Sequence, residues 1–376
     1  GNDLIWSLSN SSSDDVALSP SAGDYSIYQK GFLLGLQKDY KGKISAMDRL
    51  ISEYPESQYV DDALFEKGRS YVLLENSSSA AQAFEKLIRE FPLSSLARKA
   101  GIQLGLLYYN DNQPEKALAA YKQVISNYPG SEEAKIALQD LKSVYIDLND
   151  INAYASYVNS IGGNIRLEVG EQDSLTYIAA EKLFMRGDND GARRSLINYL
   201  QTFPEGAFSS NANFYLGSIA FAKKEFDEAI QRFKSVIASG DTKFLEESVA
   251  RTAEIEYLSK DYPAALESFK RLQIVAENPE NRQAARLGIM RCALQTGQQK
   301  DALLAADELL KEPKLSPELE AEARYVRAKA YIAQKQANKA LADLKELSKD
   351  RQPGSRDTSR CGGQISVGPT ILRYQR

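Results

Sequence analysis

The sequence predicts an all-α, right-handed α-solenoid of about nine helix-turn-helix repeats, chiefly because residue types recur every 37 positions. Gly68 recurs as Gly105, Tyr71 as Tyr108, Ala80 as Ala117, Phe84 as Tyr121, and Pro92 as Pro129. A constant spacing in this range is typical of a repeat array. Within each unit, a small residue lets two helices approach closely, an aromatic residue fills the space beside it, and Pro ends the second helix.

The same period continues through most of the chain. One position early in each predicted second helix, mostly alanine, recurs at intervals of 36 to 38 residues: Lys43, Ala80, Ala117, Tyr154, Ala192, Ala229, Ala265, Ala302 and Ala340. Lys43 and Tyr154 differ in type, but the spacing is kept at both. We therefore count nine repeats, each with two apolar patterns at helical spacing.

Polar turns and proline junctions separate the predicted helices. Turns inside the repeats are expected at 74–76, 110–112, 149–150, 187–189, 260–261 and 297–298. Between repeats, an aromatic residue precedes Pro55, Pro92, Pro129 and Pro204. A serine two positions after each of the first three prolines (Ser57, Ser94 and Ser131) can cap the next helix, and Ser316 can do so before Pro317.

These patterns predict four segments. Residues 1–23 form an irregular leader or the remnant of an upstream repeat, 24–170 hold repeats 1–4, 171–350 hold repeats 5–9, and 351–376 form a flexible or artefactual tail without the repeat. Gly162, Gly163 and Asn164 interrupt the fourth repeat, so we expect a softer junction there. The alternation of Ile165, Leu167 and Val169 with charged residues suggests a short extended segment after it.

The composition argues against catalysis and against metal or cofactor binding. The 376 residues include no histidine, which removes the commonest general base and metal ligand, and the two cysteines are too few for a zinc site. There is no glycine-rich phosphate loop, and Glu320 and Glu322 fit a solvated helix face. The net charge is −4 without a basic stripe, so nucleic acid is not an expected partner, and no apolar run is long enough to span a membrane.

The repeat resembles the tetratricopeptide family, in which the first helix of each unit lines a groove that holds a partner peptide or helix. This resemblance covers residues 24–350 and implies a protein partner. It assigns ten residues to the groove: Tyr25, Tyr28, Phe65, Arg69, Tyr109, Tyr177, Phe214, Phe221, Tyr257 and Tyr325. The alternative is that these aromatic side chains pack between neighbouring first helices. Arg69 and Lys329 are isolated cations, so a carboxylate clamp is not expected, and few charges should line the groove.

The junctions at Pro55, Pro92, Pro129 and Pro204 are similar to those of tetratricopeptide proteins of the bacterial cell envelope, of the Tol-Pal-associated and outer-membrane assembly types. That resemblance implies a periplasmic location, with the cytoplasm as the alternative. The predicted function is a non-enzymatic scaffold for protein–protein interaction, in envelope assembly or cell division. The alternative function is a self-associating solenoid, a homo-oligomer without a peptide ligand.

Overall fold

The computed structural model describes residues 20–162 and 167–349, and these ranges contain 18 α-helices and no β-strand. The helices form nine consecutive pairs: α2 (Pro20–Leu36) with α3 (Tyr40–Glu53), α4 (Val60–Leu73) with α5 (Ser77–Glu90), α6 (Ser95–Asn110) with α7 (Pro114–Asn127), α8 (Glu132–Asp147) with α9 (Ile151–Ile161), α10 (Val169–Met185) with α11 (Asn189–Thr202), α12 (Ser209–Ala222) with α13 (Phe226–Ala238), α14 (Leu245–Leu258) with α15 (Tyr262–Val275), α16 (Pro279–Thr296) with α17 (Gln299–Leu310), and α18 (Pro317–Ala333) with α19 (Ala337–Lys349). The predicted all-α array of nine helix pairs is confirmed.

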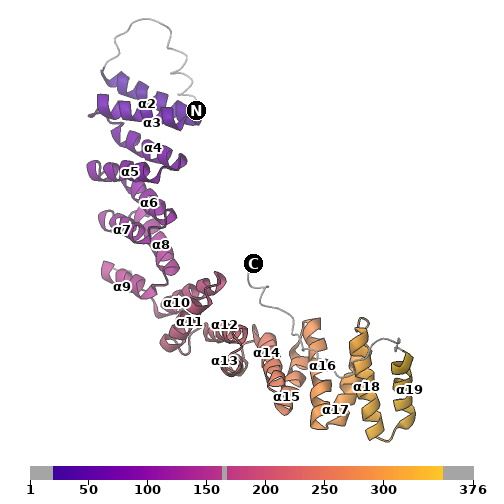
Figure 1. Ribbon diagram of the computed structural model, residues 1–376. Coiled ribbons are helices and arrows are strands. Elements are labelled where there is room, and N and C mark those ends of the chain that lie inside the picture. Colours follow the sequence, from indigo (N-terminus) through magenta and orange to yellow (C-terminus); the bar gives the residue numbers. More distant parts are fainter. Residues whose placement is uncertain (1–19, 163–166, 350–376) are drawn as a thin grey trace. The chain divides into compact units, whose positions relative to one another are not determined.

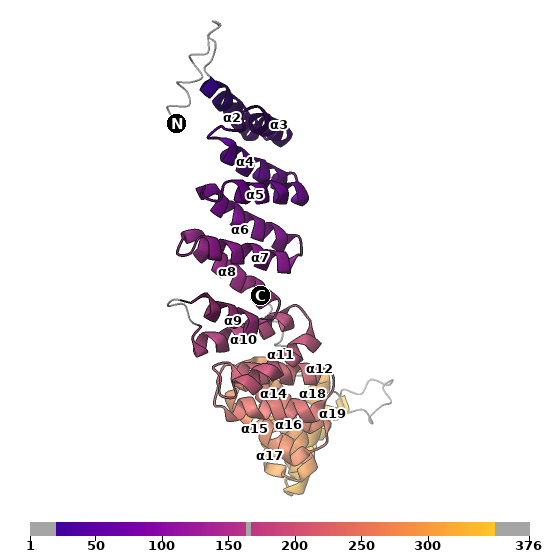
Figure 2. The same ribbon diagram turned by 90° about the vertical axis from the view of Figure 1, so that its left-hand side faces the viewer.

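The chain divides into two compact units at Tyr154, inside α9, so that α2 to α8 belong to the first unit and α10 to α19 to the second. In the first unit the helices follow one another in chain order along the stack, as both Figure 1 and Figure 2 show. In the second unit each helix again packs on its neighbours in sequence. The boundary that the sequence suggests, after residue 170, stays a prediction.

Within the described residues, two helices begin at other positions than the sequence predicts. Helix α2 begins at Pro20, four residues before the predicted start of the array, because proline is well suited to the first turn of a helix. Val169, expected in an extended segment, is instead the first residue of α10. Residues 1–19, 163–166 and 350–376 lie outside the described residues, and with them most of the predicted leader, much of the predicted junction and the tail.

Close contact between the two helices of a pair explains the period of the glycines. A Cβ atom on Gly68 would lie 2.5 Å from the ring of Phe84, and one on Gly105 would lie 2.5 Å from the ring of Tyr121. Both rings and Ala117 are almost completely buried. The predicted arrangement of a small residue against an aromatic one is therefore confirmed in these pairs.

Each helix pair turns through one residue with a left-handed backbone. These nine residues have φ between 53° and 83°, and their spacing repeats that of the alanine positions: Lys38, Glu75, Asn112, Asn149, Gly187, Lys224, Lys260, Gly297 and Lys335. The next residue often caps the second helix, as Asp39 and Asn76 do by accepting a hydrogen bond from the backbone N–H three residues on. The predicted turns are confirmed, although most lack the glycine that this conformation favours.

The junctions between repeats end and begin helices largely as predicted. Ser94, Ser131 and Ser316 are N-caps whose hydroxyl oxygens accept backbone hydrogen bonds at the start of α6, α8 and α18. Ser57 is not a cap, since the N-cap of α4 is Tyr59. Its hydroxyl instead donates to Asp24 of α2 at 2.6 Å, and Ser94 donates in the same way to Asp61 of α4 at 2.7 Å. These bonds, 37 residues apart, join each first helix to the next repeat.

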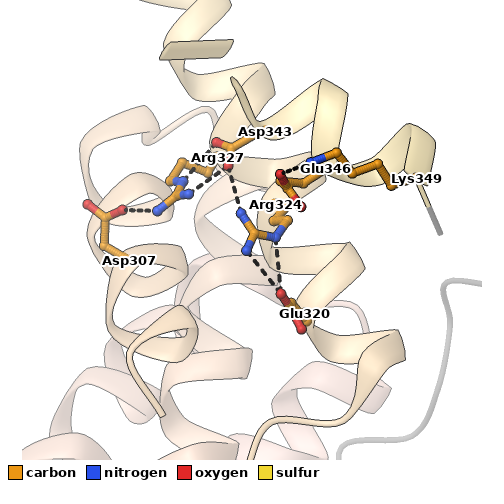
Figure 3. A network of polar contacts seen from close by, with 7 residues as sticks. All are labelled: Asp307, Glu320, Arg324, Arg327, Asp343, Glu346 and Lys349. Carbon is orange, nitrogen blue, oxygen red and sulfur yellow. Dashed lines mark hydrogen bonds and ion pairs between the residues drawn. The ribbon is translucent and has the colours of Figure 1, made fainter. Parts of the chain in front are cut away.

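Arginines hold the last helix pair of the second unit to the pair before it (Figure 3). Arg327 of α18 donates to Asp343 of α19 at 2.6 and 2.8 Å and to Asp307 of α17 at 3.0 Å. Arg324 reaches Asp343 at 3.4 Å and Glu320 at 3.0 Å. The Asp343 side chain is only 2% exposed, and its hydrogen bond is the main cause that raises the pKa of Arg327. An aspartate buried this deeply requires such partners.

Candidate partner-binding face

The first helix of each pair in the first unit presents one open face. We define the first-helix face by the positions 18, 14, 11 and 7 residues before the repeating alanine position, which share one side of an α-helix. In the first unit it consists of Tyr25, Gln29, Phe32 and Leu36 of α2, Asp62, Glu66, Arg69 and Leu73 of α4, Lys99, Gln103, Leu106 and Asn110 of α6, and Ile136, Asp140, Ser143 and Asp147 of α8. None of these side chains is buried.

Apolar side chains on this face stay in solvent. Leu36 is 66% exposed, Leu73 58%, Ile136 48% and Leu106 44%. Single exposed leucines are ordinary on a protein surface, but here an exposed apolar residue lies on this face in each of four consecutive first helices, and Leu36 and Leu73 share one repeat position. The first-helix face of the first unit can therefore offer apolar contacts to a partner over several repeats.

Carboxylates lie among these apolar residues. Burial, followed by the nearby charges of Asp61 and Glu66, raises the pKa of Asp62. Burial, followed by the charges of Asp62, Glu66 and Asp61, raises the pKa of Tyr28 to about 12. Glu66 is paired with Lys43 at 2.5 Å, whereas Asp62 makes no ion pair with the described residues. This part of the face is acidic and is suited to accept hydrogen bonds.

Several of the equivalent positions of the second unit are filled by contacts within the chain, although Ile178 and Leu258 there stay 38% and 44% exposed. Arg251 and Glu254 of α14 form an ion pair at 2.9 Å, with the two side chains only 10% and 15% exposed. The Arg251 guanidinium also lies over the ring of Phe221, 4.8 Å from its centroid. Arg291 of α16 donates to both oxygens of Glu322 of α18, at 2.7 and 2.9 Å. Charges that are used in this way have little capacity to bind a partner.

Glu247 of α14 is an exception to this pairing. It is 9% exposed, its side chain makes no hydrogen bond with any residue that the structure describes, and its buried oxygen Oε1 has no partner. Burial is the main cause that raises its pKa, against the opposing charge of Arg251. Glu247 occupies the repeat position of Glu322, but the position equivalent to Arg291 is Ser218. Within the described residues, the preceding repeat therefore brings no cation to Glu247 as it does to Glu322, and the opposing charge comes from Arg251 of the same helix.

Two of the ten residues predicted to line the groove belong to the core of the second unit. Tyr177 is 2% exposed and stacks on Phe208, with ring centroids 4.5 Å apart, and Phe214 is 3% exposed and stacks on Phe244 at 4.3 Å. The position that they share points towards the next repeat, where the stacking ring is the N-cap residue of the next first helix. In these two cases the structure favours the alternative of packing between repeats.

The other predicted residues are at least partly exposed but divide between two environments. Tyr28 stacks on Tyr59 at 5.4 Å, and Phe65, Phe221 and Tyr257 are half-buried against neighbouring rings. The more exposed residues are Tyr25, Arg69, Tyr109 and Tyr325, of which Tyr25 and Arg69 lie on the first-helix face of the first unit. Tyr325 of the second unit is covered on one side by Lys329, whose Nζ lies 5.2 Å from the ring centroid.

The expectation of a nearly uncharged groove is wrong, and so is the assignment of Glu322 to a solvated face. Glu322 is 13% exposed because Arg291 of the preceding repeat covers it. The residues that sequence reasoning missed are the charged members of this face, above all Glu247, Arg251, Glu254 and Arg291. The sequence did contain a signal for this pair, since Arg291 and Glu322 are oppositely charged residues at first-helix-face positions of consecutive repeats.

No group of three His, Cys, Asp or Glu side chains in the described ranges is placed to hold a metal ion. Likewise, none of the helices α2 to α19 is long and apolar enough to cross a membrane.

Family models match three stretches of the chain. Residues 25–57 and 179–242 each match a model described as tetratricopeptide repeat. Residues 61–139, which run from α4 into α8, match the YfiO model, described as outer membrane lipoprotein. No curated protein matches the sequence significantly.

Solved structures of helical repeat proteins align with the chain at low similarity. The tetratricopeptide domain of P58(IPK) is 15% identical, covering 88% of this chain and 94% of that one, with a TM-score of 0.28. The TPR2AB domain of yeast Sti1, in its pHSP90 complex, is 13% identical, covering 72% of this chain and 99% of that one, with a TM-score of 0.34. A tetratricopeptide protein from Parabacteroides merdae is 15% identical over 71% and 98%, with a TM-score of 0.28. The helix pairs, their 37-residue period and the three family matches together identify the chain as a tetratricopeptide-repeat protein, similar over residues 61–139 to outer membrane lipoproteins.

Proposed function

We propose that the chain is a non-enzymatic scaffold that holds a segment of another protein along the first-helix face of its first unit. The observation that carries the proposal is the row of exposed Leu36, Leu73, Leu106 and Ile136 on consecutive first helices. Apolar side chains at the centre of an interface contribute most of its binding free energy when they are desolvated. A partner segment that spans several repeats would cover this row.

The carboxylates among the leucines indicate the partner's polar chemistry. Asp62 has no cation of its own, so a lysine, an arginine or a backbone N–H of the partner would supply the missing donor. Binding should consequently weaken as the salt concentration rises, in contrast to a purely apolar groove.

The match of residues 61–139 to the outer membrane lipoprotein model covers α4 to α7 and part of α8, which is most of this face. On that basis we propose a periplasmic location and a role in bacterial envelope assembly or cell division. The cytoplasm stays the alternative location.

Capture of partners from bacterial envelope extracts tests the proposal with a matched pair of variants. Leu73→Asp places a charge on the first-helix face, whereas Leu93→Asp changes a 98% exposed leucine at a junction outside it. Leu73→Asp should abolish capture of proteins that the unchanged chain retains, and Leu93→Asp should not. Equal capture by both variants would show that the face does not bind. Phe214, a core residue, is unsuitable for such a test.

A second candidate function is self-association, favoured by the exposed side chains of the last pair. Ile332 is 58% exposed, Leu341 51% and Leu344 40%. An apolar surface of this kind can pair two copies of a chain. Light scattering over a range of protein concentrations separates the two functions, since a concentration-independent monomer contradicts self-association.

A further inference from the structure

A basic cleft in the second unit, outside the first-helix face, has no role in the proposed scaffold. It lies between the start of α16 and the segment that joins α17 to α18, and its volume is about 270 Å³. Its lining residues are Pro279, Arg282, Gln283, Arg286, Glu312, Pro313 and Lys314. Three of these are cationic and one is anionic, so the lining carries a charge of +2 in a chain whose net charge is −4.

The carboxylate in the cleft is already used by the protein. Glu312 accepts a hydrogen bond from Nη1 of Arg286 on one oxygen and from Nε2 of Gln283 on the other, both at 2.8 Å. These bonds fix the Arg286 side chain against the wall of the cleft. They also leave Glu312 little capacity to neutralise the remaining two cations.

Arg286 keeps a donor that nothing in the described chain satisfies. Its Nε is buried and has no acceptor, although the side chain as a whole is 25% exposed. A buried guanidinium N–H without an acceptor is costly, because it has lost water without gaining a partner. Lys314, across the cleft, is exposed and forms no ion pair with the described residues.

We propose that this cleft binds a phosphate-type oxyanion, with Arg286 and Lys314 as its principal ligands. A dianion matches the charge of the lining, and its several oxygens can accept from donors on two elements. Arg282 lies one helical turn from Arg286 on the same side of α16, but it is committed in part to the carbonyl oxygens of Ala276 and Glu277, at 2.9 and 3.4 Å. It therefore contributes mainly through its charge.

Titration of the full chain with inorganic phosphate, at constant ionic strength set with chloride, tests the site. Amide resonances of Gln283 and Glu312 should shift with saturation. Lys314→Gln and Arg286→Lys should each weaken binding by about tenfold, since each removes a charge-assisted hydrogen bond. Arg286→Lys keeps the charge and the possible pair with Glu312, so a loss there reports the guanidinium donors as a group and not the electrostatic field.

Lys300→Gln is the matched control, because Lys300 is an exposed lysine at the opposite end of α17. It should leave the affinity for phosphate unchanged. The proposal would be overturned if the resonances did not shift at about 10 mM phosphate, which corresponds to about 3 kcal/mol of binding free energy. Weakening of phosphate binding by Lys300→Gln to the same extent as by Lys314→Gln would also overturn it.

Vesicles distinguish the two sources of such a phosphate. If the ligand is a lipid headgroup, the chain should sediment with phosphatidylglycerol vesicles but not with phosphatidylcholine vesicles, and Lys314→Gln should reduce that sedimentation. If the ligand is a free phosphate compound, neither vesicle should bind while the phosphate titration still succeeds. Both results support the cleft as an oxyanion site and assign its source.

Discussion

The two units use several of the same repeat positions differently. In the first unit the first-helix face leaves Leu73 and Ile136 about half exposed, whereas in the second unit the same face contains Arg251 and Glu247 at 9% exposure each. Ion pairs between and within first helices cover part of that face in the second unit, where Ile178 and Leu258 stay 38% and 44% exposed. The 37-residue period therefore determines how the helices stack. The residue type at each position of the first-helix face determines whether that position is exposed to a partner.

The largest expected effect in the second unit comes from removal of Asp343, whose ion pairs hold the two helices of the last pair together (Figure 3). Asp343→Ala leaves two arginines without their shared carboxylate and should cost about 3–5 kcal/mol of local stability. Hydrogen exchange should show faster exchange in α18 and α19. Glu346→Ala, on the exposed side of α19, should have little effect, and equal exchange in both variants would contradict the structural role of Asp343.

Removal of equivalent arginines from the two units should give unequal results. Arg291→Ala leaves Glu322 buried without its bidentate partner and should reduce the free energy of unfolding by about 2–3 kcal/mol. Arg69→Ala changes a side chain that is 58% exposed and 3.4 Å from Glu66, and should cost less than about 0.5 kcal/mol. Urea denaturation measures both changes, and similar losses would remove the distinction between the units.

Glu247→Gln should stabilise the protein at neutral pH by about 1 kcal/mol, because a neutral amide costs less to bury than an unpaired carboxylate. The sign follows from the pKa, which burial raises above the ordinary value of 4.5 in the folded chain. The folded state then binds the proton more tightly than the unfolded state, so Glu247 lowers stability as the pH rises through the interval above 4.5.

The gain of Glu247→Gln over the unchanged chain should therefore shrink towards pH 4, where Glu247 is protonated in both states. Thermal midpoints measured from pH 4 to pH 8 check this dependence. A constant difference across that range, or a lower midpoint for Glu247→Gln at pH 7, would show that Glu247 is satisfied in the folded protein.

Much of the fold could be predicted from the sequence because each local signal has a short-range cause. Gly68 requires a close helix contact and Pro92 ends a helix wherever the rest of the chain lies. The candidate site was harder to predict, since the exposure of a side chain depends on which residues of the neighbouring repeat contact it. Phe65 and Phe214 occupy equivalent positions, yet only Phe214 meets an aromatic N-cap residue, Phe244, that buries it.

Ion pairs between repeats were missed for a related reason. Arg291 and Glu322 are 31 residues apart, so neither helix shows the pair by itself. Only alignment of consecutive repeats places them together, and the same alignment shows that the repeat before Glu247 has Ser218 at the position of Arg291. The raised pKa of Asp62 was missed as well, because it results from burial together with the charges of Asp61 and Glu66, which composition does not report.

Hydrogen exchange in the presence of a captured partner tests the central claim most directly. The account predicts that the partner slows exchange in the first helices α2, α4, α6 and α8, while the second helices α3, α5 and α7 and the first helices of the second unit change little. The side chains that the partner covers should include Leu73 and Leu106. Protection confined to the second helices, or to α14, α16 and α18, would contradict the assignment of the open first-helix face as the binding surface.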